Sequence, residues 1–147
     1  MRIAVGCDHA GFEAPEPLHM PGIVAHLKDR GFEVVDCGTD GPDAVDYPDF
    51  AKRVCEAIRD GRADLGVLLC GTGIGMSITA NRNPGIRAAV CVNPEMVRMA
   101  RAHNDANIIC LGRRLLSLAE CTDLIDLFLD TEASDAERHK RRVAKMG

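Results

Sequence analysis

Five short apolar runs, separated by segments with helical spacing, constrain the fold of this chain more than any other feature of its sequence. They cover residues 3–7, 33–37, 65–70, 86–92 and 107–111. Most are apolar at successive positions, which is typical of strands buried on both faces of a parallel sheet. Helical patterns follow them, at residues 23–30, 48–60, 74–80, 94–103, 117–129 and 135–145. This alternation predicts a three-layer, Rossmann-like α/β fold: a five-stranded parallel sheet with helices on both faces.

The length of 147 residues suits one domain, and we find no linker, internal repeat or low-complexity tract within residues 1–147. One segment is unusual, because residues 13–22 carry Pro15, Pro17 and Pro21 where the first helix should begin. Proline is tolerated in a first helical turn but not in a helix interior. We therefore expect the first regular helix to start near Gly22.

Charge and cysteine content exclude several classes of protein. The net charge of -4 disfavours a nucleic-acid partner, and no apolar run reaches the length of about 18 residues that a membrane helix needs. None of the seven cysteines forms a C-x-x-C pair, so we expect no zinc site and no other metal or cofactor. Many free thiols fit a reducing compartment, which favours the cytoplasm.

A ligand site is expected where two polar clusters meet at one edge of the sheet. Open α/β sheets bind ligands beyond the carboxyl ends of their strands, at the point where the strand order reverses. If the order is 2-1-3-4-5, that crevice lies between the first and third strands. Asp8 and His9 follow the first strand, and residues 70–75 follow the third.

The segment Cys70-Gly71-Thr72-Gly73-Ile74-Gly75 is the strongest candidate for chemistry. Alternating glycines let several backbone N–H groups converge at the start of a helix, where they favour an anion. A thiol at that rim can become a usable base. The alternative is a tight strand-to-helix turn with a buried cysteine.

Four other clusters have both a functional and a structural explanation. Asp8 and His9 could orient a sugar hydroxyl, or Asp8 could cap the next helix. Asp46-Tyr47-Pro48 has the form of a helix start, with Asp46 as the cap. His103-Asn104-Asp105 ends a helix, where a histidine often only complements the helix dipole. Arg138 and Arg142 share a helical face that suits a phosphate, or else form ion pairs with nearby acids.

Together these clusters resemble the ribose-5-phosphate isomerase B family, within the wider family that includes galactose-6-phosphate isomerase subunits. The matching motifs occur in family order from residue 1 to about 146: G-C-D-H-A-G-F at 6–12, D-Y-P at 46–48, C-G-T-G-I-G-M-S at 70–77, H-N-D-A-N at 103–107, and R-H-x-x-R at 138–142. The resemblance implies aldose–ketose isomerisation of a sugar phosphate, a homodimer or tetramer, and an active site shared between subunits.

The resemblance also implies a role for each matching residue. Cys70 is the base that removes the C2 proton, and His103, from the partner subunit, opens the sugar ring. Asp8, His9 and Thr72 surround the ring and its hydroxyls, with His9 near the phosphate, and Tyr47 belongs to the substrate-binding D-Y-P motif. Asn104 and the amides of Gly71, Gly73 and Gly75 stabilise the enediolate, whereas the phosphate is bound by Arg114, Arg138 and Arg142.

Other functions remain open from the sequence. The sugar could be galactose 6-phosphate, allose 6-phosphate or a tetrulose phosphate, although complete motifs favour ribose 5-phosphate. A non-catalytic sugar-phosphate-binding module would have no need of Cys70 and His103, and a flavodoxin-like regulatory domain would have no use for the arginine pair. The proline-rich segment, which appears about five residues longer than in the family, could change the choice of sugar or only lengthen a surface turn.

Overall fold

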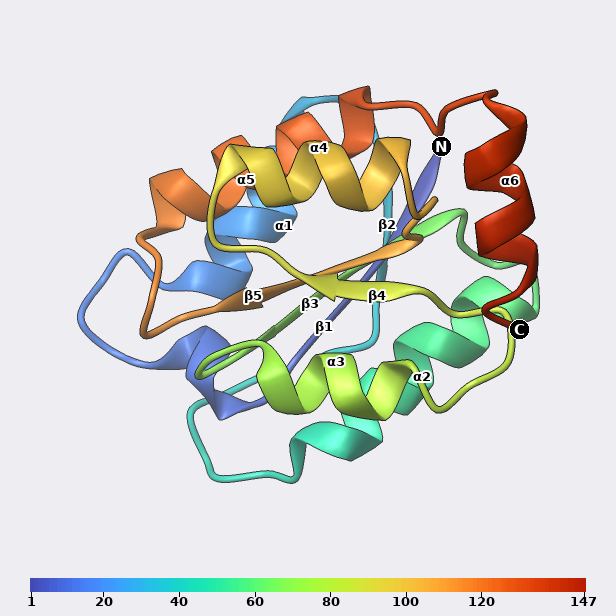
Figure 1. Ribbon diagram of the computed structural model, residues 1–147. Coiled ribbons are helices and arrows are strands. Elements are labelled where there is room, and N and C mark those ends of the chain that lie inside the picture. Colours follow the sequence, from blue (N-terminus) through green and yellow to red (C-terminus); the bar gives the residue numbers. More distant parts are fainter.

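The computed structural model describes residues Met1–Gly147 and contains one five-stranded parallel sheet with helices around it (Figure 1). The strands are β1 (Arg2–Cys7), β2 (Glu33–Asp36), β3 (Leu65–Cys70), β4 (Ala88–Val90) and β5 (Ile108–Gly112). The helices are α1 (His19–Asp29), α2 (Tyr47–Arg59), α3 (Ile74–Ala80), α4 (Pro94–Ala102), α5 (Leu118–Asp130) and α6 (Glu137–Ala144), with a short 3₁₀ helix, η1, at His9–Phe12. The predicted fold class is confirmed. None of these helices has the length and apolar character that crossing a membrane requires.

The strand order is β2-β1-β3-β5-β4, so the expected order of the last two strands is wrong. Strand β5 is buried at all five positions and pairs with β3 on one side and β4 on the other. Strand β4 is only three residues long and half-buried, so it suits the sheet edge. The outcome follows from burial, because a central strand must be apolar on both faces. The pairing of β1 with β3 is as expected.

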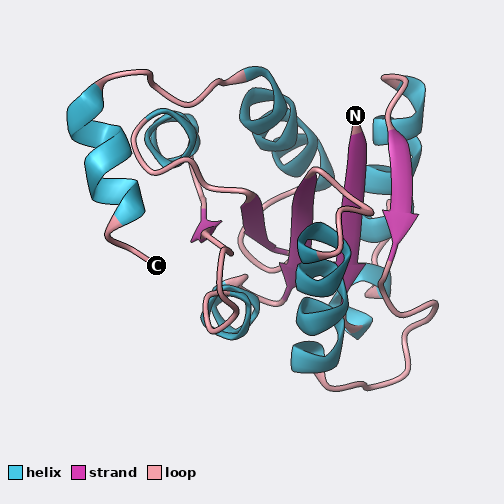
Figure 2. Cartoon of the chain, turned by 90° about the vertical axis from the view of Figure 1, so that its right-hand side faces the viewer, coloured by secondary structure: helices cyan, strands magenta, loops and turns pink.

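Helices lie on both faces of the sheet (Figures 1 and 2), and each face has its own hydrophobic core. Helices α1, α4 and α5 cover one face, where Phe128, Ile23 and Leu27 pack on the strands. Helices α2 and α3 cover the other, where Val54 and Met76 are fully buried. Helix α6 lies beyond the end of α4, at the right of Figure 1. The layered packing fixes the ends of β1 and β3 side by side.

Helix α1 begins at His19, three residues before the expected start. Pro21 is therefore the third helical residue, where its missing N–H costs nothing because the first four N–H groups of a helix have no intrahelical partner. The buried ring of His19 lies 2.8 Å, by Nε2, from the carbonyl oxygen of Leu116. The proline-rich segment thus ends inside the first helical turn.

Candidate active site

A cavity of about 470 Å³ opens at the carboxyl ends of β1 and β3. Its walls come from η1, the start of α2, the glycine loop at residues 71–75 with α3, and the turn after β5. Eight of the predicted site residues line it: Asp8, His9, Tyr47, Cys70, Gly71, Thr72, Gly75 and Arg114. The structure thus brings together two clusters that are 60 residues apart in sequence, as expected from the pairing of β1 with β3.

Cys70 is the last residue of β3, and its side chain lies on the floor of this cavity. The residue is only 5% exposed, and its Sγ accepts a hydrogen bond from the N–H of Gly73 at 3.1 Å. Gly73 takes a left-handed conformation, with φ of 81°, as the N-cap of α3. This backbone turns the N–H toward the sulfur, where it stabilises negative charge.

The other six cysteines are unpaired, and burial disfavours the thiolate form of each. Burial raises the pKa of Cys7 and Cys121 to about 12, and that of Cys55 and Cys91 to about 11. Burial also raises the pKa of Cys37 and Cys110. These six therefore remain protonated thiols at neutral pH and act as small apolar side chains.

Asp8 and His9 are held by backbone groups beside the thiol. Asp8 is buried, and its Oδ1 accepts a hydrogen bond from the N–H of Ala10 at 2.9 Å, so it caps η1. The Nδ1 of His9 accepts a hydrogen bond from the N–H of Val45 at 3.2 Å. This contact requires an unprotonated Nδ1, so the proton of neutral His9 is on Nε2. The capping role of Asp8 leaves its second oxygen for a ligand.

Tyr47, Thr72 and Arg114 complete the wall around the glycine loop. The ring of Tyr47 packs so closely on Gly75 that an added Cβ would lie 2.6 Å from ring carbons. The hydroxyl of Thr72 accepts a hydrogen bond from the N–H of Ile74 at 3.3 Å. Arg114 lies over Gly71, where an added Cβ would be 3.1 Å from its Nη1. The side chain of Asp46, by contrast, makes no capping hydrogen bond at the start of α2.

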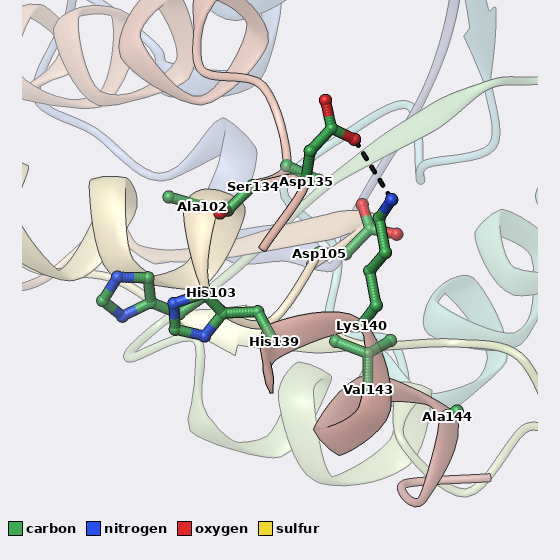
Figure 3. A pocket seen from close by; sticks show the side chains of 10 residues that line it. Ala102, His103, Asp105, Ser134, Asp135, His139, Lys140, Val143 and Ala144 are labelled. Carbon is green, nitrogen blue, oxygen red and sulfur yellow. Dashed lines mark ion pairs between the residues drawn. The ribbon is translucent and has the colours of Figure 1, made fainter. Parts of the chain in front are cut away.

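Gly73, the N-cap of α3, belongs to the same loop as Cys70. The other four predicted residues, His103, Asn104, Arg138 and Arg142, do not line this cavity. His103 follows α4 and precedes β5, so it is at the amino end of a strand, whereas Cys70 is at a carboxyl end. His103 lines a different cavity, of about 300 Å³, together with residues of α6 (Figure 3). Asn104 is exposed beside β4, and Arg138 and Arg142 are exposed on α6. One chain alone therefore does not unite these residues with Cys70.

The ring of His103 is stacked on that of His139, with centroids 4.2 Å apart and planes 10° from parallel (Figure 3). His139 is the one buried residue of α6. Burial, and then the charges of His103, Arg138 and Arg142, lower its pKa. The stack fixes α6, and with it the arginine pair, next to His103.

The charged groups around this stack divide into paired and unpaired ones. Lys140 forms ion pairs with Asp135 at 3.4 Å and Glu137 at 3.9 Å, and the first is drawn in Figure 3. The structural explanation of the cluster therefore holds for Lys140, whereas Arg138 and Arg142 form no ion pair. Asp105 bridges Arg87 and Arg101 at 3.2 Å each, so it stabilises the turn that carries His103 and Asn104.

The sequence predicted no role for several residues at these sites. Glu13 lies beside Arg114, Arg113 binds the proline-rich segment, and His139 supports His103. Each depends on contacts between distant parts of the chain, which no local pattern reveals. Ile74 and Ile78 lie on the cavity wall and are exposed. Their i, i+4 spacing can be read from the sequence, but their exposure cannot. No three His, Cys, Asp or Glu side chains are grouped as a metal site requires.

Comparisons with known proteins agree with these motifs. The sequence profile of the family described as Ribose/Galactose Isomerase matches residues 3–146. The chain is 42% identical to ribose-5-phosphate isomerase B of Escherichia coli, over 97% of this chain and 91% of that protein. It is 39% identical to ribose-5-phosphate isomerase B of Mycolicibacterium paratuberculosis, over 97% and 87% of the two chains.

Solved structures show the same fold. The structure of Clostridium thermocellum ribose-5-phosphate isomerase B superposes with a TM-score of 0.93 at 48% identity, covering 100% of this chain and 95% of the other. The type B ribose 5-phosphate isomerase of Trypanosoma brucei gives 0.91 at 45% identity, covering 99% and 95%. The match of profile, relatives and fold extends over nearly the whole chain. The chain therefore belongs to the ribose/galactose isomerase family.

Proposed function

We propose that this protein interconverts ribose 5-phosphate and ribulose 5-phosphate through an enediolate. One observation carries the proposal: a cysteine whose sulfur accepts a hydrogen bond from the N–H of Gly73, in a cavity at the β1–β3 crevice. The relatives named ribose-5-phosphate isomerase B support this choice of sugar. Binding alone would need no base, so this arrangement favours an enzyme over a sugar-phosphate-binding module.

In this mechanism Cys70 removes the proton from C2 and returns it to C1. The N–H groups of the glycine loop, with Asn104, stabilise the oxyanion that develops on the enediolate. His103 opens the sugar ring, Asp8 and His9 bind its hydroxyls, and the arginines bind the phosphate. The residue roles come from the family resemblance, and the cavity around Cys70 supports those of its own lining residues.

We also propose that the active site is completed by a second copy of the chain. Cys70 and His103 lie at opposite ends of the parallel strands. An antiparallel pairing of two chains would therefore bring one chain's His103 to the other's Cys70. Exposed apolar side chains on α3 and α4 support such a contact. Ile74 and Ile78 are 53% and 60% exposed, and Met96 and Met99 are 39% and 37% exposed.

Location and metal independence are part of the same proposal. Seven free cysteines support the cytoplasm, where thiols stay reduced. Proton transfer by Cys70 requires no metal, so full activity after exhaustive EDTA treatment is expected. Activity that is lost to EDTA and restored by one divalent ion would contradict the proton-transfer mechanism.

The test compares kcat/KM for ribose 5-phosphate, allose 6-phosphate, galactose 6-phosphate and erythrulose 4-phosphate on the wild type and on Arg142→Ala. We expect ribose 5-phosphate to be the best substrate. Loss of a charge-assisted contact of about 1.5–3 kcal/mol should raise KM at least about tenfold for it. Arg141→Ala is the matched control, because Arg141 is exposed on the same helix but one position away from that face. A four- or six-carbon sugar that wins by over tenfold would overturn the ribose assignment.

A further inference from the structure

The proline-rich segment is tied at both ends to the turn that follows β5. At its start, Nη2 of Arg113 donates hydrogen bonds to the carbonyl oxygens of Glu13 and Ala14, both at 3.2 Å. At its end, the buried His19 ring lies 2.8 Å from the carbonyl oxygen of Leu116. The backbone of Glu13 is therefore held in place by a residue 100 positions away.

The same turn is also attached to the glycine loop. The N–H of Arg113 donates to the carbonyl oxygen of Cys70 at 2.8 Å, and the N–H of Arg114 donates to that of Gly71 at 3.0 Å. One turn thus links the floor of the cavity with the proline-rich segment. The segment does not line the cavity itself, but a side chain of this turn, which does line the cavity, connects the two.

That side chain is Arg114. Its Nε lies 3.8 Å from Oε2 of Glu13, an oxygen that is shielded from water and accepts no hydrogen bond. No hydrogen bond or other ion pair holds the guanidinium, and the side chain is 63% exposed. An exposed arginine samples many rotamers, and ordering it costs conformational entropy. Glu13 offers the one charged group that restricts this motion while it leaves both terminal nitrogens of Arg114 free.

We propose that Glu13 is a positioning residue, which holds the Nε edge of Arg114 so that the terminal N–H groups point at the substrate phosphate. The inference rests on the proposed function, which assigns Arg114 to the phosphate. Arg113 contributes by fixing the backbone of Glu13. A carboxylate near a phosphate also repels it. A rise in KM on Glu13→Gln therefore indicates positioning, whereas a fall in KM indicates plain repulsion.

The experiment is a double-mutant cycle of Glu13→Gln and Arg114→Gln, with KM and kcat for ribose 5-phosphate and the inhibition constant of inorganic phosphate. An exposed ion pair of this kind corresponds to about a two- to fivefold effect. Glu13→Gln should raise KM and the inhibition constant by that factor, with kcat within twofold. In the Arg114→Gln background it should change neither. Glu16→Gln is the matched control, since Glu16 is an exposed acid of the same segment that has no ion pair.

A KM that is unchanged or lower in Glu13→Gln would overturn positioning, and so would an equal rise in the Arg114→Gln background. Arg113→Met provides a second variant: it should raise KM in the wild type and have no effect in Glu13→Gln. If Arg114→Gln raises KM while Glu13→Gln does not, only this inference fails. If Arg114→Gln leaves KM unchanged, the phosphate assignment of Arg114 fails with it.

Discussion

Seven cysteines with the same side chain have different surroundings in this molecule. Cys70 is at the end of a strand, lines the candidate active-site cavity and accepts a hydrogen bond from a backbone N–H through its sulfur. Cys91 is also buried but lies in the apolar core of one face, where burial raises its pKa to about 11. The hydrogen bond from the glycine loop, and not burial, distinguishes the candidate base from the other six cysteines.

Replacing the base should remove most of the activity. We expect Cys70→Ala to lower kcat by at least about 10²-fold, the usual scale for the loss of a general base, with little change in sugar-phosphate affinity. Steady-state kinetics and thermal melting measure the two effects. Cys91→Ala is the matched control, and it should keep kcat near that of the wild type. Turnover close to normal in Cys70→Ala would remove Cys70 from the mechanism.

At the scale of elements, the junction between β3 and α3 depends on Gly73. Its φ of 81° suits glycine, and an added Cβ would be 3.1 Å from backbone atoms of Leu111, which cannot move aside easily. Gly73→Ala should therefore destabilise the fold by roughly 1–2 kcal/mol and also displace the N–H from Cys70, so that kcat falls. Denaturant unfolding and kinetics together test this expectation.

Gly61 provides the control for that substitution. It has a φ of 74° with no atom within 4 Å of an added Cβ. It lies between α2 and the amino end of β3, whereas the glycine loop follows the carboxyl end of that strand. Gly61→Ala should carry a similar conformational cost and leave kcat unchanged. Equal loss of kcat in both variants would show that general destabilisation, and not the hydrogen bond to the thiol, explains the effect.

The sequence predicted the elements well because apolar periodicity is a local property. The strand at Leu65–Cys70 and the helix at Ile74–Ala80 begin and end where expected. The order of β4 and β5 was not predictable in this way, because it depends on which strand the whole fold buries. The start of α1 was placed too late, because Pro21 falls in a first turn that tolerates it.

The site was predictable in part. Motifs that follow β1 and β3 converge because neighbouring parallel strands end together, and eight predicted residues do share one cavity. The pairing of Glu13 with Arg114 and the stack of His103 on His139 join residues whose separation in sequence hides them. Sequence patterns reveal which residues follow a strand, but not which distant side chain supports them.

At the scale of the whole molecule, the buried thiols lower the stability of the fold at alkaline pH. The ordinary thiol pKa is 9.0, and burial in the folded chain raises the pKa of Cys7 and Cys121 to about 12 and that of Cys55 and Cys91 to about 11. Between these values the unfolded chain binds fewer protons than the folded one, so the free energy of unfolding falls as pH rises above about 9.

Urea unfolding at pH 8, 9 and 10 should show this loss, with a slope of at most about 1.4 kcal/mol per pH unit for each thiol. Cys121→Ala should make the slope shallower, whatever its effect on absolute stability. A slope that is the same in Cys121→Ala and the wild type would show that this thiol does not contribute.

The distribution of the site over both ends of the parallel strands leads to a test of assembly. Mixed Cys70→Ala and His103→Ala chains should recover part of the activity, because a hybrid dimer contains one site with both residues intact. The control is each variant mixed with itself, which should stay inactive. No recovery, despite proven subunit exchange, would place both residues in the site of one subunit.

Because Cys70 and His103 lie at opposite ends of the strands, a substrate that touches both residues would bridge two chains. Its binding energy would then also stabilise the dimer. If dimerisation raises the affinity for sugar phosphate by some factor, thermodynamic linkage requires that bound sugar phosphate raise the dimerisation constant by the same factor. On dilution, the unliganded dimer should dissociate at a higher protein concentration than the dimer saturated with sugar phosphate. Metabolite supply would thus set the amount of assembled enzyme as well as its turnover.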